Sequence, residues 1–428
     1  MATESIRIDS APKQIGLLTA ALLCLVAVVF VVKWCAANAM ASNTINREVA
    51  DLAQSWAPGD PQTHFTSAVL WERNFSSEDV PKAIGEYEQA TALAPRDFRT
   101  WLALGKARER GGDRAGAEAA LKKSQELAPN YSQVNWTLGN VLLRENKRSD
   151  AFAQMSRAAE SDRDFVNPTV ATAWRIFDGD LVQVKQSLGD SPIINAAFVE
   201  FLAREKRFDD AVKIWNSLPA EKRNTTFKKI GTILFEQMIV AGKYRAAAQT
   251  LASMGDAQTM SPGVGTIFNG GFETDVKPER ETIFDWQIGA GAQPIIGVDD
   301  QQKHGGSRSL TVLFNSSTGH DFRPVSQIIA VDSGERYAFE IFYKSELKTA
   351  ATVYWEVAEL PGGKVLAQMP PVSAASDWTN LKIEFVAPPS ENIEAVVVRL
   401  ARETCKSSLC PISGRVWFDD LSLVKIQN

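Results

Sequence analysis

The sequence predicts an α-helical solenoid followed by an all-β sandwich, with one apolar helix near the N-terminus. An uninterrupted apolar run comes first, and a helical pattern then recurs at an offset of 34 residues. From about residue 266 the apolar residues alternate with a period of two, which is typical of strands. These changes divide the chain into a short tail (1–14), a transmembrane helix (15–34), a linker (35–62), a solenoid (63–257) and a sandwich (258–428).

The apolar run, residues 15–32, reads IGLLTAALLCLVAVVFVV and carries no charge. At a rise of about 1.5 Å per residue, it just spans a hydrocarbon core of about 30 Å. Lys33 and Trp34 follow it and suit the membrane interface. The alternative is a cleaved signal peptide, because Ala37-Asn38-Ala39 and Ala39-Met40-Ala41 both fit an A-x-A site. The run is longer than the apolar part of most signal peptides, which favours a retained anchor.

The cysteines bear on which side of the membrane the chain lies. Cys24 is inside the apolar run, whereas Cys405 and Cys410 lie in ETCKSSLCPISG. That spacing can close a small loop as a disulfide, and disulfides persist outside the reducing cytosol; two free thiols are the alternative. We therefore expect a single-pass protein of the inner membrane with its C-terminal bulk in the periplasm.

The composition argues against several classes of function. The net charge is −5, so we expect no nucleic-acid partner. No H-E-x-x-H, C-x-x-C, phosphate-binding-loop or G-x-S-x-G motif occurs, which favours a non-catalytic protein. A glycan-processing role stays open if Glu340 and Glu356 pair. The three histidines are scattered, and we expect them at the surface.

The repeat is clearest where KAIGEYEQATALAP (82–95) aligns with GAEAALKKSQELAP (116–129). A Trp101-x2-Leu104-Gly105 motif precedes Ala117 and Pro129, and this pattern resembles the tetratricopeptide repeat. We expect Gly105 and Ala117 to allow close helix approach, and Pro129 to end the second helix because it lacks an N–H and clashes with the preceding turn. The positions in register are Ala83, Ala117 and Ala151; Tyr87, Leu121 and Met155; Ala90, Ser124 and Ala158; and Pro95 and Pro129.

The resemblance is strong over 66–162 and decays after it. Residues 204–219 and 241–254 are interpreted as degenerate units, with Ala211 and Trp215 at repeat positions. Repeat units of this kind stack because none buries its apolar face alone. The resemblance implies a protein partner on the concave face of the solenoid; a spacer without a partner is the alternative.

The second half of the chain consists of strand-length segments. They are rich in β-branched and aromatic residues and are separated by Gly, Pro, Asp and Ser. Seven or eight such strands predict a β-sandwich. The segments are SLTVLF (309–314), VSQIIAV (325–331), YAFEIFYK (337–344), ATVYWEVAEL (351–360), LKIEFVA (381–387), EAVVVRLA (394–401) and RVWFDDLSLV (415–424).

Short motifs occur in a fixed order through this region. NGGFE (269–273) opens it, HGGSRSL (304–310) follows, Trp378 begins a strand and FDDLSL (418–423) closes it. This series resembles carbohydrate-binding modules of families four and nine, which are galactose-binding-like jelly rolls. The resemblance covers about 266–428 and implies a jelly roll more firmly than it implies sugar binding.

The resemblance also implies a structural calcium ion. Glu273 and Asp419 match the family's ligands, with carbonyls near Gly306 as further donors and Asp420 as a substitute for Asp419. The alternative is that Glu273 caps local backbone N–H groups. No other cofactor is expected.

Aromatic residues that point away from the core suggest where a glycan binds. Alternation along the strands turns Phe342, Arg399 and Trp417 outward, and we expect their three strands to share one sheet. A flat ring can stack on a sugar, and arginine can donate to its hydroxyls. Tyr354 and Glu356, on the opposite sheet, form a rival set. Outward aromatics can instead pack on a neighbouring domain.

Together these features favour a non-catalytic, membrane-anchored binding protein of a bacterial envelope. The solenoid is expected to bind a protein partner and the sandwich a polysaccharide, in the context of exopolysaccharide assembly or export. The alternatives are a pure protein scaffold without sugar binding, or an accessory part of a glycan-processing enzyme system.

Overall fold

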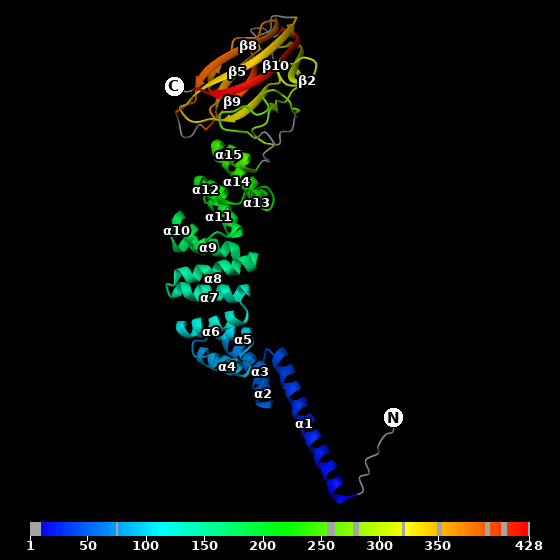
Figure 1. Ribbon diagram of the computed structural model, residues 1–428, viewed down its shortest axis with the longest axis vertical. Helices are drawn as coiled ribbons and strands as arrows, with labels where there is room; N and C mark the ends of the chain where they lie inside the picture. Colours follow the sequence, from blue (N-terminus) through cyan, green and yellow to red (C-terminus); the bar gives the residue numbers. More distant parts are fainter. Residues whose placement is uncertain are drawn as a thin grey trace. The chain divides into compact units, whose positions relative to one another are not determined.

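The predicted fold class is confirmed: helices occupy the N-terminal half, and two antiparallel five-stranded sheets follow (Figure 1). The chain divides into two compact units, Met1–Ile194 and Asn195–Asn428, so the division falls among the helices. The computed structural model describes residues 10–73, 76–254, 262–276, 282–318, 322–348, 353–389, 394–403 and 409–426.

Helix α1 (Ala11–Asn43) contains the apolar run and continues well beyond it. Among the described residues it is the one helix long and apolar enough to cross a membrane. Its apolar side chains are solvent-facing, with Leu18 69% and Phe30 68% exposed. Nothing in the folded chain covers this surface within the part that the structure describes, which is what a lipid-facing helix requires.

The last turns of α1 pack on α2 (Arg47–Trp56) and α3 (Pro61–Glu72). Ala37 and Ala41 of α1 are buried in one cluster with Ala53 and Ala57. The expectation of a linker at 35–62 is therefore wrong. Small alanine side chains let these helices approach closely, and the first helix pair begins inside the segment expected as linker.

Two hydrogen bonds fix the same junction. Asn38 Nδ2 donates to Asp60 Oδ2 at 2.8 Å, and Thr66 Oγ1 donates to the carbonyl of Ala41 at 3.0 Å. The carboxylate of Asp60 also caps α3 by accepting the N–H of Gln62.

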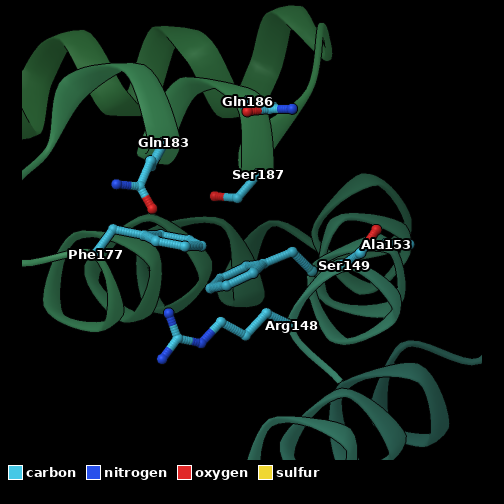
Figure 2. A pocket seen from close by; sticks show the side chains of 8 residues that line it. Arg148, Ser149, Ala153, Phe177, Gln183, Gln186 and Ser187 are labelled. Carbon is cyan, nitrogen blue, oxygen red and sulfur yellow. The ribbon is translucent and has the colours of Figure 1, made fainter. Parts of the chain in front are cut away.

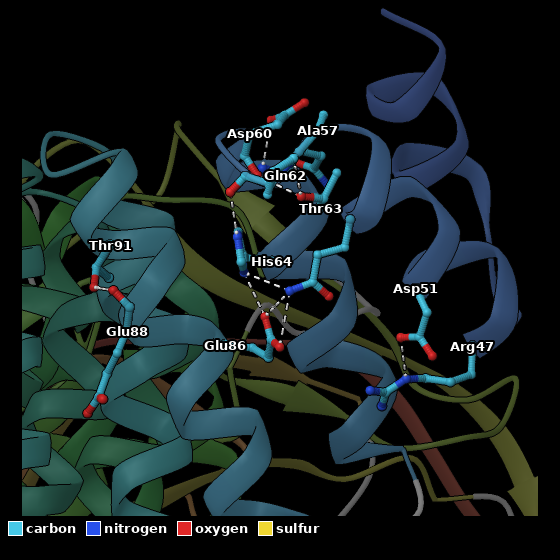
Figure 3. A network of polar contacts seen from close by, with 12 residues as sticks. Arg47, Asp51, Ala57, Asp60, Gln62, Thr63, His64, Glu86, Glu88 and Thr91 are labelled. Atoms are coloured by element: carbon cyan, nitrogen blue, oxygen red, sulfur yellow. Dashed lines mark hydrogen bonds and ion pairs between the residues drawn. The ribbon is translucent and has the colours of Figure 1, made fainter. Parts of the chain in front are cut away.

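A partly buried polar cluster joins the next helices (Figure 3). His64 of α3 is 8% exposed, so the expectation of a surface histidine is wrong for this residue. Its Nδ1 lies 2.7 Å from Glu86 Oε2 and its Nε2 lies 3.0 Å from the carbonyl of Pro58. Gln54 of α2 donates to Glu86 Oε2 at 3.0 Å. Side chains from α2, α3 and α4 are thus tied together.

The repeat region folds as antiparallel pairs, α3 with α4, α5 with α6 and α7 with α8. Asp97 and Asp113 begin α5 and α6 by accepting backbone N–H groups with their carboxylates. The bounds are α4 (Val80–Leu93), α5 (Phe98–Arg110), α6 (Arg114–Leu127), α7 (Ser132–Arg144) and α8 (Arg148–Ser161).

The 34-residue register is confirmed by burial, since Ala83, Ala117 and Ala151 are all 0% exposed. Gly105 is required for close approach: a Cβ there would lie 2.5 Å from Leu121 Cγ, below the optimum of about 3.5–4.0 Å. The remaining apolar register positions, Tyr87, Leu121, Met155, Ala90 and Ala158, are also buried.

The helices after α8 are shorter and less regular, as the decay of the repeat indicates. Ala211 and Trp215 are fully buried, so the degenerate unit keeps its packed positions. A Cβ at Gly231 would lie 2.8 Å from the Trp215 ring. The bounds are η1 (Arg163–Phe165), α9 (Val166–Ile176), α10 (Leu181–Leu188), α11 (Pro192–Arg204), α12 (Phe208–Ser217), α13 (Ala220–Asn224), α14 (Lys228–Val240) and α15 (Tyr244–Met254).

The sandwich consists of two sheets, which we call the β9 sheet and the β10 sheet after their central strands. The β9 sheet has the order β1 (Gln287–Ile288), β4 (Val325–Ala330), β9 (Ala395–Arg402), β6 (Val353–Leu360) and β7 (Val365–Gln368). The β10 sheet has the order β2 (Ile295–Asp299), β3 (Ser309–Thr318), β10 (Leu409–Lys425), β5 (Arg336–Leu347) and β8 (Ala375–Val386).

Aromatic rings fill the space between the sheets. Trp355 of β6 is fully buried and meets Phe418 of β10 edge-on, with ring centroids 5.5 Å apart. Trp286 packs on Trp355 at 5.8 Å. On β5 the predicted inward residues, Tyr337, Phe339, Ile341 and Tyr343, are all buried. The inward and outward faces of the strands therefore follow the alternation in the sequence.

Candidate functional site

The three residues predicted to form one glycan-binding surface lie in two different sheets. Phe342 on β5 and Trp417 on β10 belong to the β10 sheet, whereas Arg399 on β9 belongs to the other. The predicted shared surface is therefore wrong. The reason is topological: consecutive strands β8, β9 and β10 alternate between the sheets, so neighbours in sequence face opposite sides of the sandwich.

Trp417 points away from the core, as expected, but it is covered. The side chain is only 3% exposed. Its Nε1 donates to Asp299 Oδ2 at 2.8 Å, and the Arg415 guanidinium lies 5.5 Å from the ring centre. Burial acts to raise the pKa of Asp299, but the Trp417 and backbone N–H donors outweigh it and hold the pKa below the ordinary value. Trp417 offers no free ring to a sugar.

Phe342 is half-buried because His304 stacks on it. The two ring centroids are 3.9 Å apart and the rings are inclined by 14°. Trp378 lies beside His304 at 5.7 Å. The histidine is held by Asp420, whose Oδ2 lies 2.7 Å from Nδ1. One face of Phe342 is thus closed.

The outer face of the β9 sheet gathers the rival set around Arg399. Strand pairing places Arg399 opposite Glu356, and Arg399 Nε donates to Glu356 Oε1 at 2.5 Å. Tyr354 lies on the same face of β6, opposite Ala401. Burial, and then the charge of Glu356, raise the pKa of the Tyr354 hydroxyl. An aromatic ring, a cation and an anion are therefore neighbours here.

The two carboxylates considered for a catalytic pair are separated by the sandwich. Glu356 belongs to the β9 sheet and Glu340 to the β10 sheet. Glu340 instead accepts a hydrogen bond from Asn380 of β8. The pairing of Glu340 with Glu356 is therefore wrong.

The ordered motifs of the sandwich meet in space. Glu273 of NGGFE accepts the backbone N–H of Ser307 at 2.8 Å and also its hydroxyl. Asp419 of FDD accepts the N–H groups of His304 and Gly305 at 2.8 and 3.0 Å. The Ser307 hydrogen bonds lower the pKa of Glu273, whereas burial raises the pKa of Asp419. Both carboxylates anchor the HGGSR loop.

The glycines of these motifs are explained by this meeting. A Cβ at Gly306 would lie 1.9 Å from Glu273 Oε1, and Gly306 has a positive φ of 53°. A Cβ at Gly270 would lie 2.0 Å from the carbonyl of Leu421. A side chain at Gly270 would force the backbone of Leu421 to move, and one at Gly306 would displace the Glu273 carboxylate in a backbone conformation that favours glycine.

These carboxylates fit the capping alternative better than a calcium site. Calcium takes six to eight oxygen ligands. The groups that face Glu273 and Asp419 in the loop are N–H donors, and a cation would have to displace them. In the described ranges no three His, Cys, Asp or Glu side chains are placed to hold a metal. The calcium ion implied by the resemblance remains a prediction.

Of the two cysteines of the predicted disulfide, one lies among the described residues. Cys410 is disulfide-bonded, whereas Cys405 lies outside the described residues. Cys24 and Cys35 of α1 are free and exposed.

On the helical unit, two cavities adjoin along the first helices of the pairs. One of about 280 Å³ lies between α3 and α5, and one of about 450 Å³ lies between α5 and α7. Lys106 and Arg110 line both. We call this surface the trough. Its lining residues are Phe65, Glu72, Tyr87, Arg99, Leu102, Ala103, Lys106, Glu109, Arg110, Gln133, Trp136, Thr137, Asn140 and Arg144.

The trough carries four cationic and two anionic side chains. Glu72 pairs with Arg110 at 2.5 Å, and Glu109 pairs with Arg144. Lys106 is half-buried and has no anionic partner within ion-pair distance among the described residues. Burial, and then the charge of Arg110, lower the pKa of Lys106. The charge of Glu72 opposes this shift, but the Glu72 carboxylate is paired with Arg110. A desolvated ammonium group without a directly paired carboxylate favours an anionic ligand.

The sequence reasoning did not single out Lys106. The signal was present, because Lys106 directly follows the Leu104-Gly105 pair that packs on the second helix. A residue one position further on turns away from that contact, toward the open side of the first helix.

Protein-family models and curated proteins yield no match to the chain. Solved structures similar to it include the enzymatically active domain of bacteriophage CBA120 tailspike protein 4, at 13% identity and a TM-score of 0.28. That match covers 39% of this chain and only 22% of the bacteriophage chain. A family 4 carbohydrate-binding module matches at 13% identity and TM-score 0.28, over 37% of this chain and 99% of its own. YrrB, a tetratricopeptide protein with an unusual peptide-binding site, matches at 13% identity and a TM-score of 0.27. That match covers 49% of this chain and 92% of the YrrB chain.

Proposed function

We propose that the chain is a membrane-anchored scaffold of a bacterial envelope whose trough holds an acidic segment of a protein partner. The observation that carries this proposal is Lys106. Its ammonium group is partly withdrawn from water at the centre of two adjoining cavities. A carboxylate placed there would restore the interaction that desolvation removes.

The shape of the trough supports an extended segment. The two cavities share Lys106 and Arg110, so a chain crossing from α3 to α7 passes both cations. Trp136 supplies apolar surface at the α7 end. Glu72 and Glu109 already neutralise Arg110 and Arg144, which leaves Lys106 as the main point of attachment.

A fluorescent octaglutamate peptide tests this proposal on the full-length chain in detergent micelles. We expect saturable binding that octalysine does not reproduce. Lys106→Glu should abolish it, because a charge-assisted contact becomes a repulsion. Lys123→Glu is the matched control, since Lys123 is an exposed lysine of α6 paired with Glu126 outside the trough. An equal loss of octaglutamate binding in both variants would show that binding depends only on the net charge of the protein, and would refute the site.

The packing of α1 supports an anchor that is retained. Ala37 and Asn38 lie within one of the A-x-A sequences. Ala37 packs in a cluster with Ala53 of α2, and Asn38 donates to Asp60 at the start of α3. Cleavage after Ala39 would remove these contacts from the folded unit. We therefore propose a single-pass inner-membrane protein with its C-terminal bulk in the periplasm. Protease added to spheroplasts should digest the sandwich, and protection until lysis would contradict this topology.

A second proposed function is glycan binding by the outer face of the β9 sheet, in exopolysaccharide assembly or export. Tyr354 and Arg399 favour it, because a flat ring beside a guanidinium donor suits a sugar, and the buried carboxylate of Glu356 holds Arg399 in place. The same geometry also suits a protein partner, in which case the chain is a scaffold without sugar binding, or it serves a glycan-processing enzyme.

Affinity electrophoresis of the full-length chain separates these outcomes. A neutral glucan, a xylan and a uronic-acid polymer serve as probes. Tyr354→Ala should remove any retardation, whereas Phe342→Ala should preserve it, because Phe342 lies in the opposite sheet under His304. Retardation lost only in Phe342→Ala would move the site to the β10 sheet. No retardation by any polymer would favour the pure scaffold.

A further inference from the structure

A third cavity of the helical unit shares no lining residue with the trough. It has a volume of about 360 Å³ and lies between the start of α8, the end of α9 and α10 (Figure 2). This is near the lower end of the range of about 300–1,000 Å³ for ligand pockets. A pocket of this size holds one compact chemical group but not a polymer chain.

Two phenyl rings form the apolar part of the pocket. Phe152 of α8 is 1% exposed and belongs to the packed interior. Phe177, which caps α9, is half-buried, and the two ring centroids are 5.6 Å apart at an inclination of 34°. The rings are in contact with each other, so an apolar ligand group cannot enter between them, but it can settle against the accessible part of Phe177 and gain contact area without disturbing the helix packing.

A cation lies at one side of these rings. The Arg148 guanidinium is 5.8 Å from the centre of the Phe177 ring, and its Nε donates to Asn146 Oδ1 at 3.2 Å. Within the described part of the chain, Arg148 forms no ion pair, so its terminal nitrogens keep their donors. A guanidinium fork can bind a carboxylate through two parallel hydrogen bonds.

Acceptors lie at the opposite side. Gln183 Nε2 donates to Asp180 Oδ2 at 3.0 Å, so the amide nitrogen is engaged and the oxygen turns toward Phe177 (Figure 2). Ser187 Oγ donates to the carbonyl of Val184 at 2.8 Å and retains lone pairs toward the cavity (Figure 2). This side therefore accepts an N–H or O–H from a ligand.

We infer that this pocket binds the C-terminal residue of a polypeptide that ends in an apolar side chain. The terminal carboxylate lies on Arg148, the apolar side chain against the accessible part of Phe177, and the backbone N–H on Gln183 or Ser187. In a terminal residue these three groups diverge from one Cα, so they reach three walls of one small cavity. An internal aspartate has the carboxylate but no apolar group on the same residue. The inference does not depend on the trough.

N-acetyl-phenylalanine is the probe, titrated against the full-length chain in detergent micelles and followed by ligand-observed NMR. We expect saturable binding of the free acid. N-acetyl-phenylalaninamide should bind at least about tenfold more weakly, because hydrogen bonds to charged groups carry that much affinity. Arg148→Gln should weaken the acid similarly, whereas Arg157→Gln, an exposed arginine of the same helix, should not.

Two further comparisons make the inference falsifiable. 3-Phenylpropionate has the ring and carboxylate but no N–H, and we expect it to bind several-fold more weakly than the acetylated amino acid. Equal binding would assign the pocket to small aryl carboxylates and overturn the inference. Phe177→Ala should also lose the acid, with circular dichroism to confirm the fold. If the acid and the amide bind alike, if Arg148→Gln keeps full affinity, or if no saturable binding occurs, the inference is wrong.

Discussion

Replacing Gly105 by alanine tests the packing of the repeat most sharply, because two effects of opposite sign meet there. Gly105 lies inside α5, where alanine is favoured over glycine by about 0.8–1.0 kcal/mol. The new Cβ would lie 2.5 Å from Leu121 Cγ and 3.3 Å from the carbonyl of Ala117. Leu121 is fully buried and cannot swing away. Overpacking of this kind costs about 1–3 kcal/mol, so the clash should win.

Gly85→Ala is the matched control. Gly85 lies inside α4, is exposed, and has no atom within 4 Å of the position of a Cβ. At this position only the preference of a helix for alanine over glycine acts, so Gly85→Ala should be more stable than the unchanged protein. A change of 1 kcal/mol corresponds to about 2–4 °C in a unit of 150–250 residues. Subtracting the helical preference from the overpacking cost leaves a net cost of up to about 2 kcal/mol for Gly105→Ala. We expect a rise of about 2–4 °C for Gly85→Ala and a fall of up to roughly 8 °C for Gly105→Ala.

Thermal unfolding of the full-length chain followed by far-UV circular dichroism measures both, because the helical signal comes from the repeats. A rise for Gly105→Ala equal to that of Gly85→Ala would mean that α5 and α6 do not approach as closely as the structure has them.

Three other predictions follow from the sandwich and the trough. Trp417→Ala should destabilise the sandwich by about 3–5 kcal/mol in denaturant unfolding, because the ring is buried and bonded to Asp299; unchanged stability would show that the ring is free. A chelator should leave the unfolding midpoint of the sandwich unchanged, whereas Glu273→Gln should lower it by weakening the Ser307 anchor; a fall with the chelator would support calcium instead. Octaglutamate affinity should fall as pH rises toward 10.5, the ordinary lysine value, because the lowered pKa of Lys106 removes its charge early; Lys106→Arg should remove this dependence.

The repeat and the strand faces could be predicted because periodicity records packing directly. Ala117 and Leu121 recur at fixed offsets since each must fit the same neighbour in every unit. Likewise Tyr337 and Phe339 alternate because a strand has two faces. These are local rules, and a single sequence is enough to apply them.

The candidate site depended on information that alternation does not contain. The alternation of apolar and polar residues predicts that Arg399 and Trp417 point away from the core. It does not predict to which of the two sheets each strand belongs. It also does not report that Asp299, more than a hundred positions away, covers Trp417. The segment 35–62 has the sequence of a linker because its alanines and polar residues show no large apolar stripe. The partial burial of Lys106 is set by neighbours on other helices, which the sequence alone does not place.

Photo-crosslinking in living cells tests the central claim, that the trough binds a protein segment, most directly. A photoreactive residue replaces Gln133, which lines the trough on α7, and in a control strain replaces Lys123 on α6. The account predicts a discrete protein adduct from position 133 alone, mapped to an acidic stretch of the partner and lost in the Lys106→Glu background. Adducts of equal yield from both positions, or an adduct that survives Lys106→Glu, would contradict it.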